Sequence, residues 1–125
     1  MFAINTDMSI HITRGDIGSI EIRAAKNENE LYTFIPGDLV RFKVCQKKNH
    51  SYVVLVKDVL VETEADVVRI DLSRNDTKLG NIIDKPTVYW YEVELNPNTA
   101  PQTIIGYDVD GPKQFILYPE GGDET

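Results

Sequence analysis

The chain has 125 residues, a length that indicates one domain with its own hydrophobic core. Its 13 basic and 20 acidic residues give a formal net charge of −7. Cys45 is the single cysteine and there are two histidines, which excludes an internal disulfide framework and the usual four-ligand zinc site. The acidic balance repels phosphate backbones, so we expect no nucleic-acid partner. The cluster of Lys43, Lys47 and Lys48 is more typical of a solvated strand end than of a basic binding patch.

No stretch reaches the roughly 18 consecutive apolar residues of a membrane-spanning helix. The first residues also lack the basic segment and the apolar run of a signal peptide. We therefore expect a protein without a membrane partner that folds in a reducing cytoplasm.

The most regular pattern of the chain is the stretch Thr87–Leu95, in which large apolar residues occupy every second position. The residues predicted to face the core are Tyr89, Tyr91, Val93 and Leu95. Those on the opposite face are Val88, Trp90, Glu92 and Glu94. Because two prolines and two asparagines follow at 96–101, the pattern predicts a central strand that ends in a turn.

Similar alternation predicts further strands at 8–13, 17–25, 39–45, 66–72, 102–109 and 114–118, with a short extended piece at 31–35. The segment 51–61 carries apolar residues in both registers, which predicts a strand covered on both faces. We expect 66–72 to form a hairpin with it and 110–113 to be a second hairpin loop. Polar capping residues from Ser73 onward, with Leu79, Ile82 and Ile83 at helical spacing, predict one or two helical turns.

These segments predict an all-β fold, an antiparallel β-sandwich of roughly seven or eight short strands with at most one short helix. Each predicted strand has one polar, solvent-facing side, which favours two open sheets packed face to face over a closed barrel. The predicted domain covers residues 8–118, and the acidic end at 119–125 is predicted to be disordered because it has nothing to bury.

Four local patterns could carry chemistry, and each has a simpler interpretation. The tripeptide 14–16, Arg-Gly-Asp, matches an integrin-recognition motif but is also ordinary turn chemistry. Residues 108–111 resemble the start of a calcium loop, yet the later acidic ligand is missing and a plain hairpin turn is favoured. Cys45 with His11 or His50 lacks a local nucleophile signature, and Glu92 with Glu94 has a spacing found on any charged strand. We therefore expect no enzyme, no metal and no cofactor.

The segments 12–16, 32–44, 69–72, 76–77 and 89–95, together with Lys57, follow a familiar order. In that order they resemble the amino-terminal domain of baseplate upper proteins and related small tail proteins of phages and prophages of Gram-positive bacteria. The family pattern is an Arg-Gly-Asp-Thr opening, a Gly-Asp strand, an Asp-Thr turn and a tyrosine-rich strand in a β-sandwich. Here Ile17 replaces the threonine, and we expect no receptor-binding or coiled-coil extension after residue 118. Both departures weaken the expectation of host adsorption and leave an assembly role open.

The resemblance implies a structural virion protein that acts through protein–protein surfaces in a baseplate or tail. Its expected partners are other phage tail or baseplate proteins and further copies of itself, and its expected location is the virion, assembled in the bacterial cytoplasm. The alternative is a carbohydrate-binding β-sandwich module in which Trp90 and the tyrosines form stacking platforms.

Val88 and Trp90 are the candidate interface residues, since they are large apolar side chains on the face of the central strand that does not face the core. Either a loop of the same chain, such as 31–36, or a second subunit is expected to cover them.

Overall fold

The computed structural model describes residues 2–4, 9–27, 30–48, 51–80, 85–99, 102–105 and 113–120. In this part of the chain β-strands dominate, and there is one short helix, α1 (Arg74–Thr77). The strands are β1 (Phe2–Ile4), β2 (Ile10–Thr13), β3 (Gly18–Ile22), β4 (Ala24–Asn27), β5 (Glu30–Tyr32), β6 (Leu39–Cys45), β7 (Val53–Leu60), β8 (Val68–Leu72), β9 (Thr87–Leu95), β10 (Gln102–Ile105) and β11 (Lys113–Tyr118). No helix among the described residues is long and apolar enough to cross a membrane.

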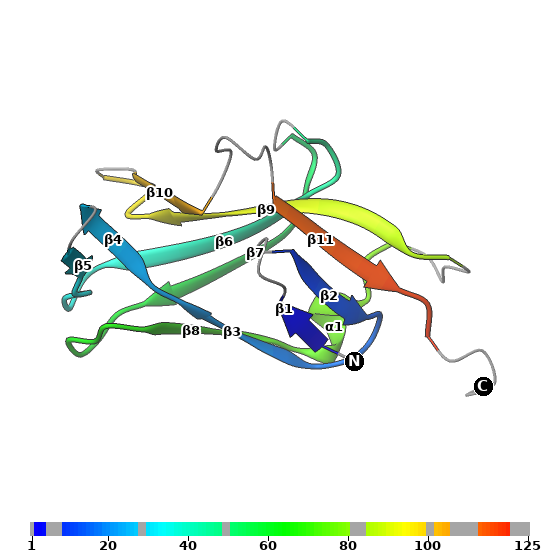
Figure 1. The fold of residues 1–125 in the computed structure, drawn as a ribbon, viewed down its shortest axis with the longest axis horizontal. Helices are drawn as coiled ribbons and strands as arrows, with labels where there is room; N and C mark the ends of the chain where they lie inside the picture. The colour runs from blue at the N-terminus through cyan, green and yellow to red at the C-terminus, as the bar shows by residue number, and fades with distance from the viewer. Residues whose placement is uncertain are drawn as a thin grey trace.

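The strands form one large curled sheet and two small ones. The seven-stranded sheet has the order β1-β2-β11-β9-β6-β7, with β10 paired to β9, and the two-stranded sheets are β3-β8 and β4-β5. Figure 1 shows β6, β9 and β11 above the β3-β8 pair, as two layers. The predicted all-β, sandwich-like fold with a single short helix is therefore confirmed.

The central strand β9 has the predicted bounds and the predicted register. Its odd-numbered residues from Tyr89 to Leu95 are all buried, and Val93 is 0% exposed. It pairs antiparallel with β6 on one edge and with β11 and β10 on the other. A strand with neighbours on both edges and one buried face is what the alternation of large side chains predicts.

The core lies between the two layers, because both the large sheet and β3-β8 direct apolar side chains into it. Alternate residues of β6 and β8 are buried, as predicted. The fully buried members contributed by these strands and by β2, β9 and β11 include Ile10, Ile12, Ile70, Val40, Phe42, Val44, Tyr91, Phe115 and Leu117. Phe42 packs against Tyr91 and Phe115 with ring centroids 5.5 and 6.3 Å apart.

Several predicted pairings are wrong. The segment 17–25 is not one strand, because the chain leaves β3 at Arg23 and continues as β4 in a different sheet. Likewise β7 and β8 do not form a hairpin: β7 pairs with β6, and β8 pairs with β3. The physical reason is that alternation specifies which face of a strand is buried but not which strand lies beside it.

The expected hairpin of the last two strands is also wrong. β10 and β11 both pair with β9, β10 along its end and β11 along its beginning. β11 in addition pairs parallel with β2, so the large sheet is not purely antiparallel. The predicted hairpin loop at 110–113 lies outside the described residues except for Lys113.

The prediction that the strand at 51–61 is covered on both faces is wrong as well. β7 is the last strand of its sheet, and only Leu55 and Val59 pack against the core. Val53, Val54 and Val56 remain 38–46% exposed. An edge strand that packs on one layer leaves its other face open, which explains the exposure of Val54 and Val56. Val53 lies in the register of Leu55 and Val59 but beside an irregularity in the β6–β7 pairing.

The short helix begins as predicted at Ser73. The Ser73 hydroxyl accepts a hydrogen bond from the Asp76 backbone N–H, and the Asp76 carboxylate accepts one from the Ser73 backbone N–H, which together make a capping box. The helix ends at Thr77, so Leu79 is buried beyond it rather than on it, and Ile82 and Ile83 lie outside the described residues.

The ordered chain extends past both predicted domain limits. β1 precedes residue 8 and pairs antiparallel with β2. At the other end Glu120 accepts a hydrogen bond from Arg14, so at least this residue of the predicted tail is held against the domain. The disorder predicted for 121–125 concerns residues outside those described.

Candidate interaction surface

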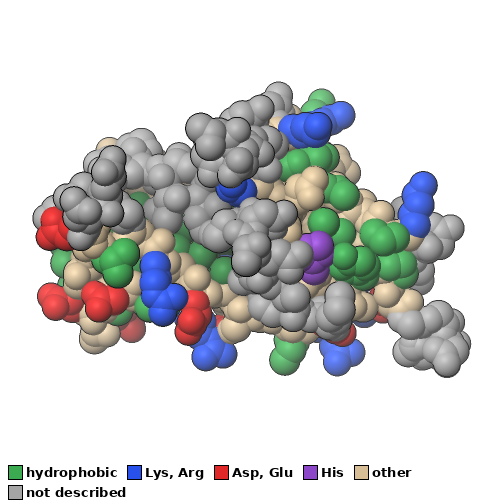
Figure 2. Space-filling model, viewed as in Figure 1, with side chains coloured by type: hydrophobic (Ala, Val, Ile, Leu, Met, Phe, Trp, Pro, Cys, Tyr) green, Lys and Arg blue, Asp and Glu red, His purple; other side chains and the backbone are tan. Residues whose placement is uncertain are grey.

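Val88, Trp90 and Ile116 form an apolar strip on the outer face of the large sheet, called here the β9 strip. Val88 is 38% exposed, while Trp90 and Ile116 are partly buried. Val88 lies directly opposite Ile116 on β11, and Ile116 lies opposite His11 on β2. Hydrophobic side chains gather around the histidine in Figure 2. The residues predicted as an interface therefore lie together on one face and are in part accessible.

The chain segment expected to cover this strip belongs elsewhere. Phe34 is 0% exposed, is a member of the core cluster and bonds through its backbone to Ala65. Its neighbours Leu31 and Ile35 are 62% and 51% exposed. Segment 31–36 thus contributes its one large buried side chain to the inner core, on the opposite side of β9 from Trp90.

The other half of the outer face carries charges that are paired with one another. The Lys43 ammonium lies 2.9 Å from Glu92 and 3.1 Å from Glu94, and Arg41 contacts Asp58 on β7 at 2.8 Å. Burial lowers the pKa of Lys43, but its hydrogen bonds to both glutamates outweigh this effect and leave the pKa raised. Glu92 and Glu94 therefore share one ammonium group across β6 and β9, an arrangement that ties two strands together.

Arg14, Gly15 and Asp16 form a structural turn rather than a displayed recognition loop. The Arg14 side chain is only 10% exposed and donates hydrogen bonds to the Gly80 carbonyl at 2.9 Å, to the Leu79 carbonyl at 3.2 Å and to Glu120. Gly15 has φ +87°, a left-handed conformation that favours glycine. The Arg-Gly-Asp tripeptide therefore has a structural role, because Arg14 holds the segment after α1 in place.

Thr77 completes this turn from the helix side. It is fully buried, accepts a hydrogen bond from the Gly15 N–H at 3.0 Å and donates one to the Asp16 carbonyl at 2.7 Å. Buried backbone groups that lose their partner cost about 1–3 kcal/mol. The Asp-Thr pair at 76–77 thus joins the capping box to the Arg-Gly-Asp turn.

We expect Thr77→Val to lower the free energy of unfolding by about 2 kcal/mol, because it keeps the side-chain shape and removes both hydrogen bonds. Urea denaturation followed by tryptophan fluorescence measures this loss. The exposed Thr63 provides a matched control, since Thr63→Val should change stability by less than about 0.5 kcal/mol. Equal midpoints for the two variants would contradict the role given to Thr77.

Cys45 is not a poised nucleophile. It was predicted on the wet face of its strand, yet it is 0% exposed and pairs across the sheet with Trp90. Burial raises the pKa of its thiol, and nearby Glu92 raises it further while Lys43 opposes this. His50 lies outside the described residues, so the expectation that it forms no catalytic pair with Cys45 stays a prediction.

The structure instead joins His11 to two residues that the sequence reading did not consider. The Ser9 hydroxyl lies 2.9 Å from His11 Nε2, and the Tyr118 hydroxyl lies 2.7 Å from His11 Nδ1, with the two rings stacked. A serine beside a histidine is the arrangement that activates nucleophiles, but Ser9 is only 4% exposed. Spacing of two on a strand places Ser9 and His11 on one face, whereas Tyr118 comes close only through the parallel β2–β11 pairing.

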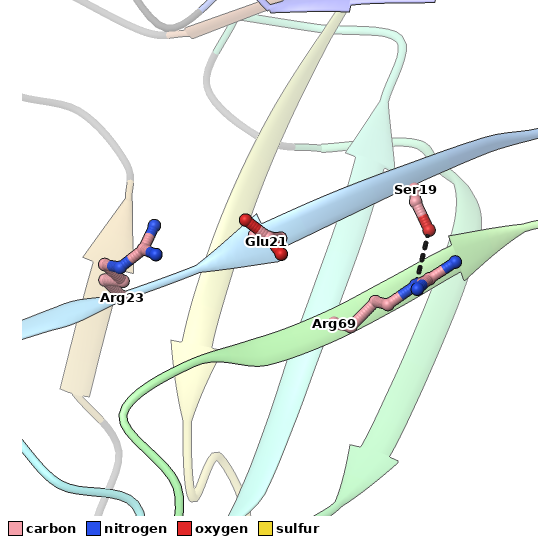
Figure 3. A pocket seen from close by; sticks show the side chains of 4 residues that line it. All are labelled: Ser19, Glu21, Arg23 and Arg69. Atoms are coloured by element: carbon pink, nitrogen blue, oxygen red, sulfur yellow. Dashed lines mark hydrogen bonds between the residues drawn. The ribbon is translucent and has the colours of Figure 1, made fainter.

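Ser19, Glu21, Arg23 and Arg69 line a shallow, open depression on the small β3-β8 sheet (Figure 3). Arg69 donates to the Ser19 hydroxyl at 2.7 Å, and Ser19 in turn donates to Asp71. Arg69 also donates to the Asp71 carboxylate at 2.9 Å, and the hydrogen bonds that Asp71 accepts, from Ser19 first and then from Arg69, lower its pKa. Two of the four lining residues, Ser19 and Arg69, are thus engaged in hydrogen bonds with each other and with Asp71.

Among the described residues no group of three or more histidine, cysteine, aspartate or glutamate side chains is placed to hold a metal ion. The calcium-like residues 108–111 lie outside that part of the chain. Comparisons of the chain with protein-family models, with curated proteins and with solved structures found no match.

The motifs that carry the phage-tail resemblance all have folding roles. Arg14 and Thr77 hold the turn described above, and Asp38 of the Gly-Asp pair is buried and accepts hydrogen bonds from Tyr32, from the Ile35 N–H and from Asn96. These hydrogen bonds stabilise the fold.

Proposed function

We propose that this protein is a structural, non-enzymatic component of a phage or prophage tail or baseplate and that it acts through protein–protein contacts. The observation that supports the proposal best is the uncovered apolar surface of the large sheet, at the β9 strip and along β7. Soluble domains expose such surface mainly where a partner binds. The order of motifs that resembles baseplate upper proteins gives the class of assembly in which the partner is sought.

The proposal is tested on particles. After prophage induction of the source bacterium, the chain should cosediment with tail structures and be detected in them by mass spectrometry at a fixed ratio to other tail proteins. A chain that remains entirely in the soluble fraction while tails are assembled would overturn the assignment. The same preparation from a strain deleted for this chain should lack complete tails.

The carbohydrate-binding alternative is supported less. Stacking on sugars requires an accessible aromatic face, but Tyr89 and Tyr91 are 6% and 1% exposed and belong to the core. Trp90, on the outer face, is partly buried and is the one aromatic of β9 left for such a role. Retention of the chain on an insoluble cell-wall polysaccharide, lost in Trp90→Ala, would favour this alternative over the assembly role.

We expect the β9 strip to contribute to self-association or to partner binding. Val88→Glu should weaken this association, because a carboxylate buried in an apolar contact loses its hydration. Trp90→Glu should weaken the association further. Size exclusion with light scattering, and pull-down of tail proteins, measure the effect. The exposed Gln114 lies directly opposite Trp90, so Gln114→Glu is a charge-matched control that tests whether added charge alone is responsible.

A further inference from the structure

β7 has the sequence of a strand that is buried on both faces, but the described part of the chain covers only one of them. Leu55 and Val59 on the inner face pack against the core. The uncovered apolar residues of the strand and of the residue before it are Tyr52 at 68%, Val53 at 46%, Val54 at 38%, Val56 at 46% and Leu60 at 59% exposure. They are five of the nine large hydrophobic residues that are exposed in the described part of the chain.

The strand also has an unused hydrogen-bonding edge. In the described part of the chain β7 is the terminal strand of the seven-stranded sheet and pairs only with β6. A free edge presents a row of backbone N–H and C=O groups whose natural complement is another extended strand. The occupant that fits both the edge and its apolar side chains is therefore a strand.

Unpaired charge does not protect this edge. Proteins often guard edge strands with charged side chains that a second strand would have to desolvate, but the charge of Lys57 on β7 is already paired with Asp76 at 2.9 Å. The neighbouring Asp58 pairs with Arg41 at 2.8 Å. Both charges of β7 are thus neutralised within the chain, and the strand brings no unpaired charge to a contact.

The flanks of β7 are charged in a self-complementary way. Lys47 and Lys48 are exposed just before the strand, and Glu62 and Glu64 are exposed just after it. When two copies pair antiparallel, the basic end of one copy lies beside the acidic end of the other. Parallel pairing would instead bring like charges together at both ends. The overall charge of −7 opposes self-association in general, so a locally balanced edge is where two copies can meet.

We propose that β7 pairs antiparallel with β7 of a second copy of this chain, across a two-fold axis at Val56, so that the two large sheets become one continuous sheet. Residues opposite each other in an antiparallel pair lie on the same face, so the axis must pass through a residue. An axis at Lys57 or Asp58 places like charges face to face. An axis at Val56 sets Val56 against itself, Val53 against Val59 and Tyr52 against Leu60.

An axis at Leu55 fits less well. It would pair only residues 53–57 of β7 with one another and would place Val59 opposite Ser51. The Val56 register instead pairs residues 53–59 with one another, with Val54 opposite Asp58 and Leu55 opposite Lys57, and it brings more of the exposed apolar side chains to the contact. This pairing is independent of the phage assignment, since it uses the edge of the sheet rather than the β9 strip.

Light scattering coupled to size exclusion tests the pairing. The wild-type chain should elute with twice its mass of 14.2 kDa, and Val56→Lys should elute as a monomer at the same concentration. Ile17→Lys is the control, because Ile17 is 72% exposed and lies between β2 and β3, outside both β7 and the β9 strip. It should leave the dimer intact, and thermal unfolding of both variants verifies that they are folded.

A wild-type monomer at the highest soluble concentration, or a dimer unchanged by Val56→Lys, would overturn the pairing. A dimer that Val88→Lys dissociates and Val56→Lys does not would place the contact at the β9 strip instead. Neither result affects cosedimentation with tails, so failure of this pairing is distinct from failure of the proposed function. Capture of the edge by a strand of another protein would appear as a wild-type monomer and therefore also counts against it.

Cross-linking tests the register in a Cys45→Ala background. Val56→Cys should form a covalent dimer on mild oxidation, because a residue on the two-fold axis faces its own copy within disulfide range. Val54→Cys should not, since two copies of residue 54 would lie about 13 Å apart along the strands. Cross-linking of Val54→Cys but not of Val56→Cys would overturn the proposed register.

Discussion

Val93→Asp should leave most of the chain unfolded without denaturant. Val93 is 0% exposed at the centre of β9, between β6 on one side and β10 on the other, with its side chain in the core. Burial of an unpaired carboxylate costs about 4 kcal/mol or more, and the whole stability of such a domain is about 5–15 kcal/mol. Circular dichroism and urea titration measure the loss.

Val88→Asp provides the control for this prediction, because it is the same substitution in the same strand on the opposite face. Val88 is 38% exposed, so the new carboxylate remains hydrated and the free energy of unfolding should fall by less than about 1 kcal/mol. If the two variants unfolded at the same urea concentration, the assignment of the inner and outer faces of β9 would be wrong.

Asp38→Ala should lower the free energy of unfolding by about 3 kcal/mol. The Asp38 carboxylate is buried and accepts hydrogen bonds from Tyr32 at 2.6 Å, from the Ile35 N–H at 3.0 Å and from Asn96 at 3.1 Å. Asn96 in turn accepts a hydrogen bond from the Leu39 N–H, so one side chain ties the turn before β6 to the turn after β9. Its removal leaves several donors without their charged acceptor.

The exposed Asp66 is the matched control for this substitution. It accepts a single hydrogen bond, from Thr33 at 3.2 Å, and Asp66→Ala should cost less than about 0.5 kcal/mol. A cost of the same size for Asp38→Ala would show that the three hydrogen bonds of Asp38 contribute little.

The effect of Asp38 should also depend on pH. Burial raises the pKa of this carboxyl, but the hydrogen bonds from Tyr32, Ile35 and Asn96 outweigh burial and leave the pKa below its ordinary value. A carboxyl whose pKa is lowered in the folded state stabilises the fold above its unfolded pKa of about 3.9, and that stabilisation is lost as the pH falls through the folded pKa. The stability difference between wild type and Asp38→Asn should therefore be constant near neutral pH and shrink below about pH 4.

The residues of the motifs reveal little about function, because their side chains hold the fold together. Asp38 and Thr77 occur in short motifs that resemble those of phage tail proteins, and both are buried hydrogen-bonding centres. The Arg-Gly-Asp turn belongs to the same group, because Arg14 is engaged by the carbonyls of Leu79 and Gly80. Residues of this kind define a fold, whereas the apolar surfaces proposed for assembly lie on β9 and β7.

Alternation alone predicted three strands correctly, β6, β8 and β9, although it joined β3 and β4 into one segment. The bounds of β6 and β9 and the inward faces of β6, β8 and β9 agree with the structure. The capped helix after Ser73 was also predicted. These features are local, because the pleat of a strand and the geometry of a helix cap depend on residues only a few positions apart.

Which strands are neighbours became clear only from the tertiary structure, and the neighbours of a strand determine which of its side chains are exposed. Cys45 is buried opposite Trp90, β11 pairs parallel with β2, and Arg14 meets the segment after α1, all through contacts between residues far apart in sequence. β7 shows the difference most clearly, since its composition predicts burial on both faces while its place at the edge of the sheet leaves one face open. Alternation encodes the face of a strand, but its position within the sheet depends on the whole chain.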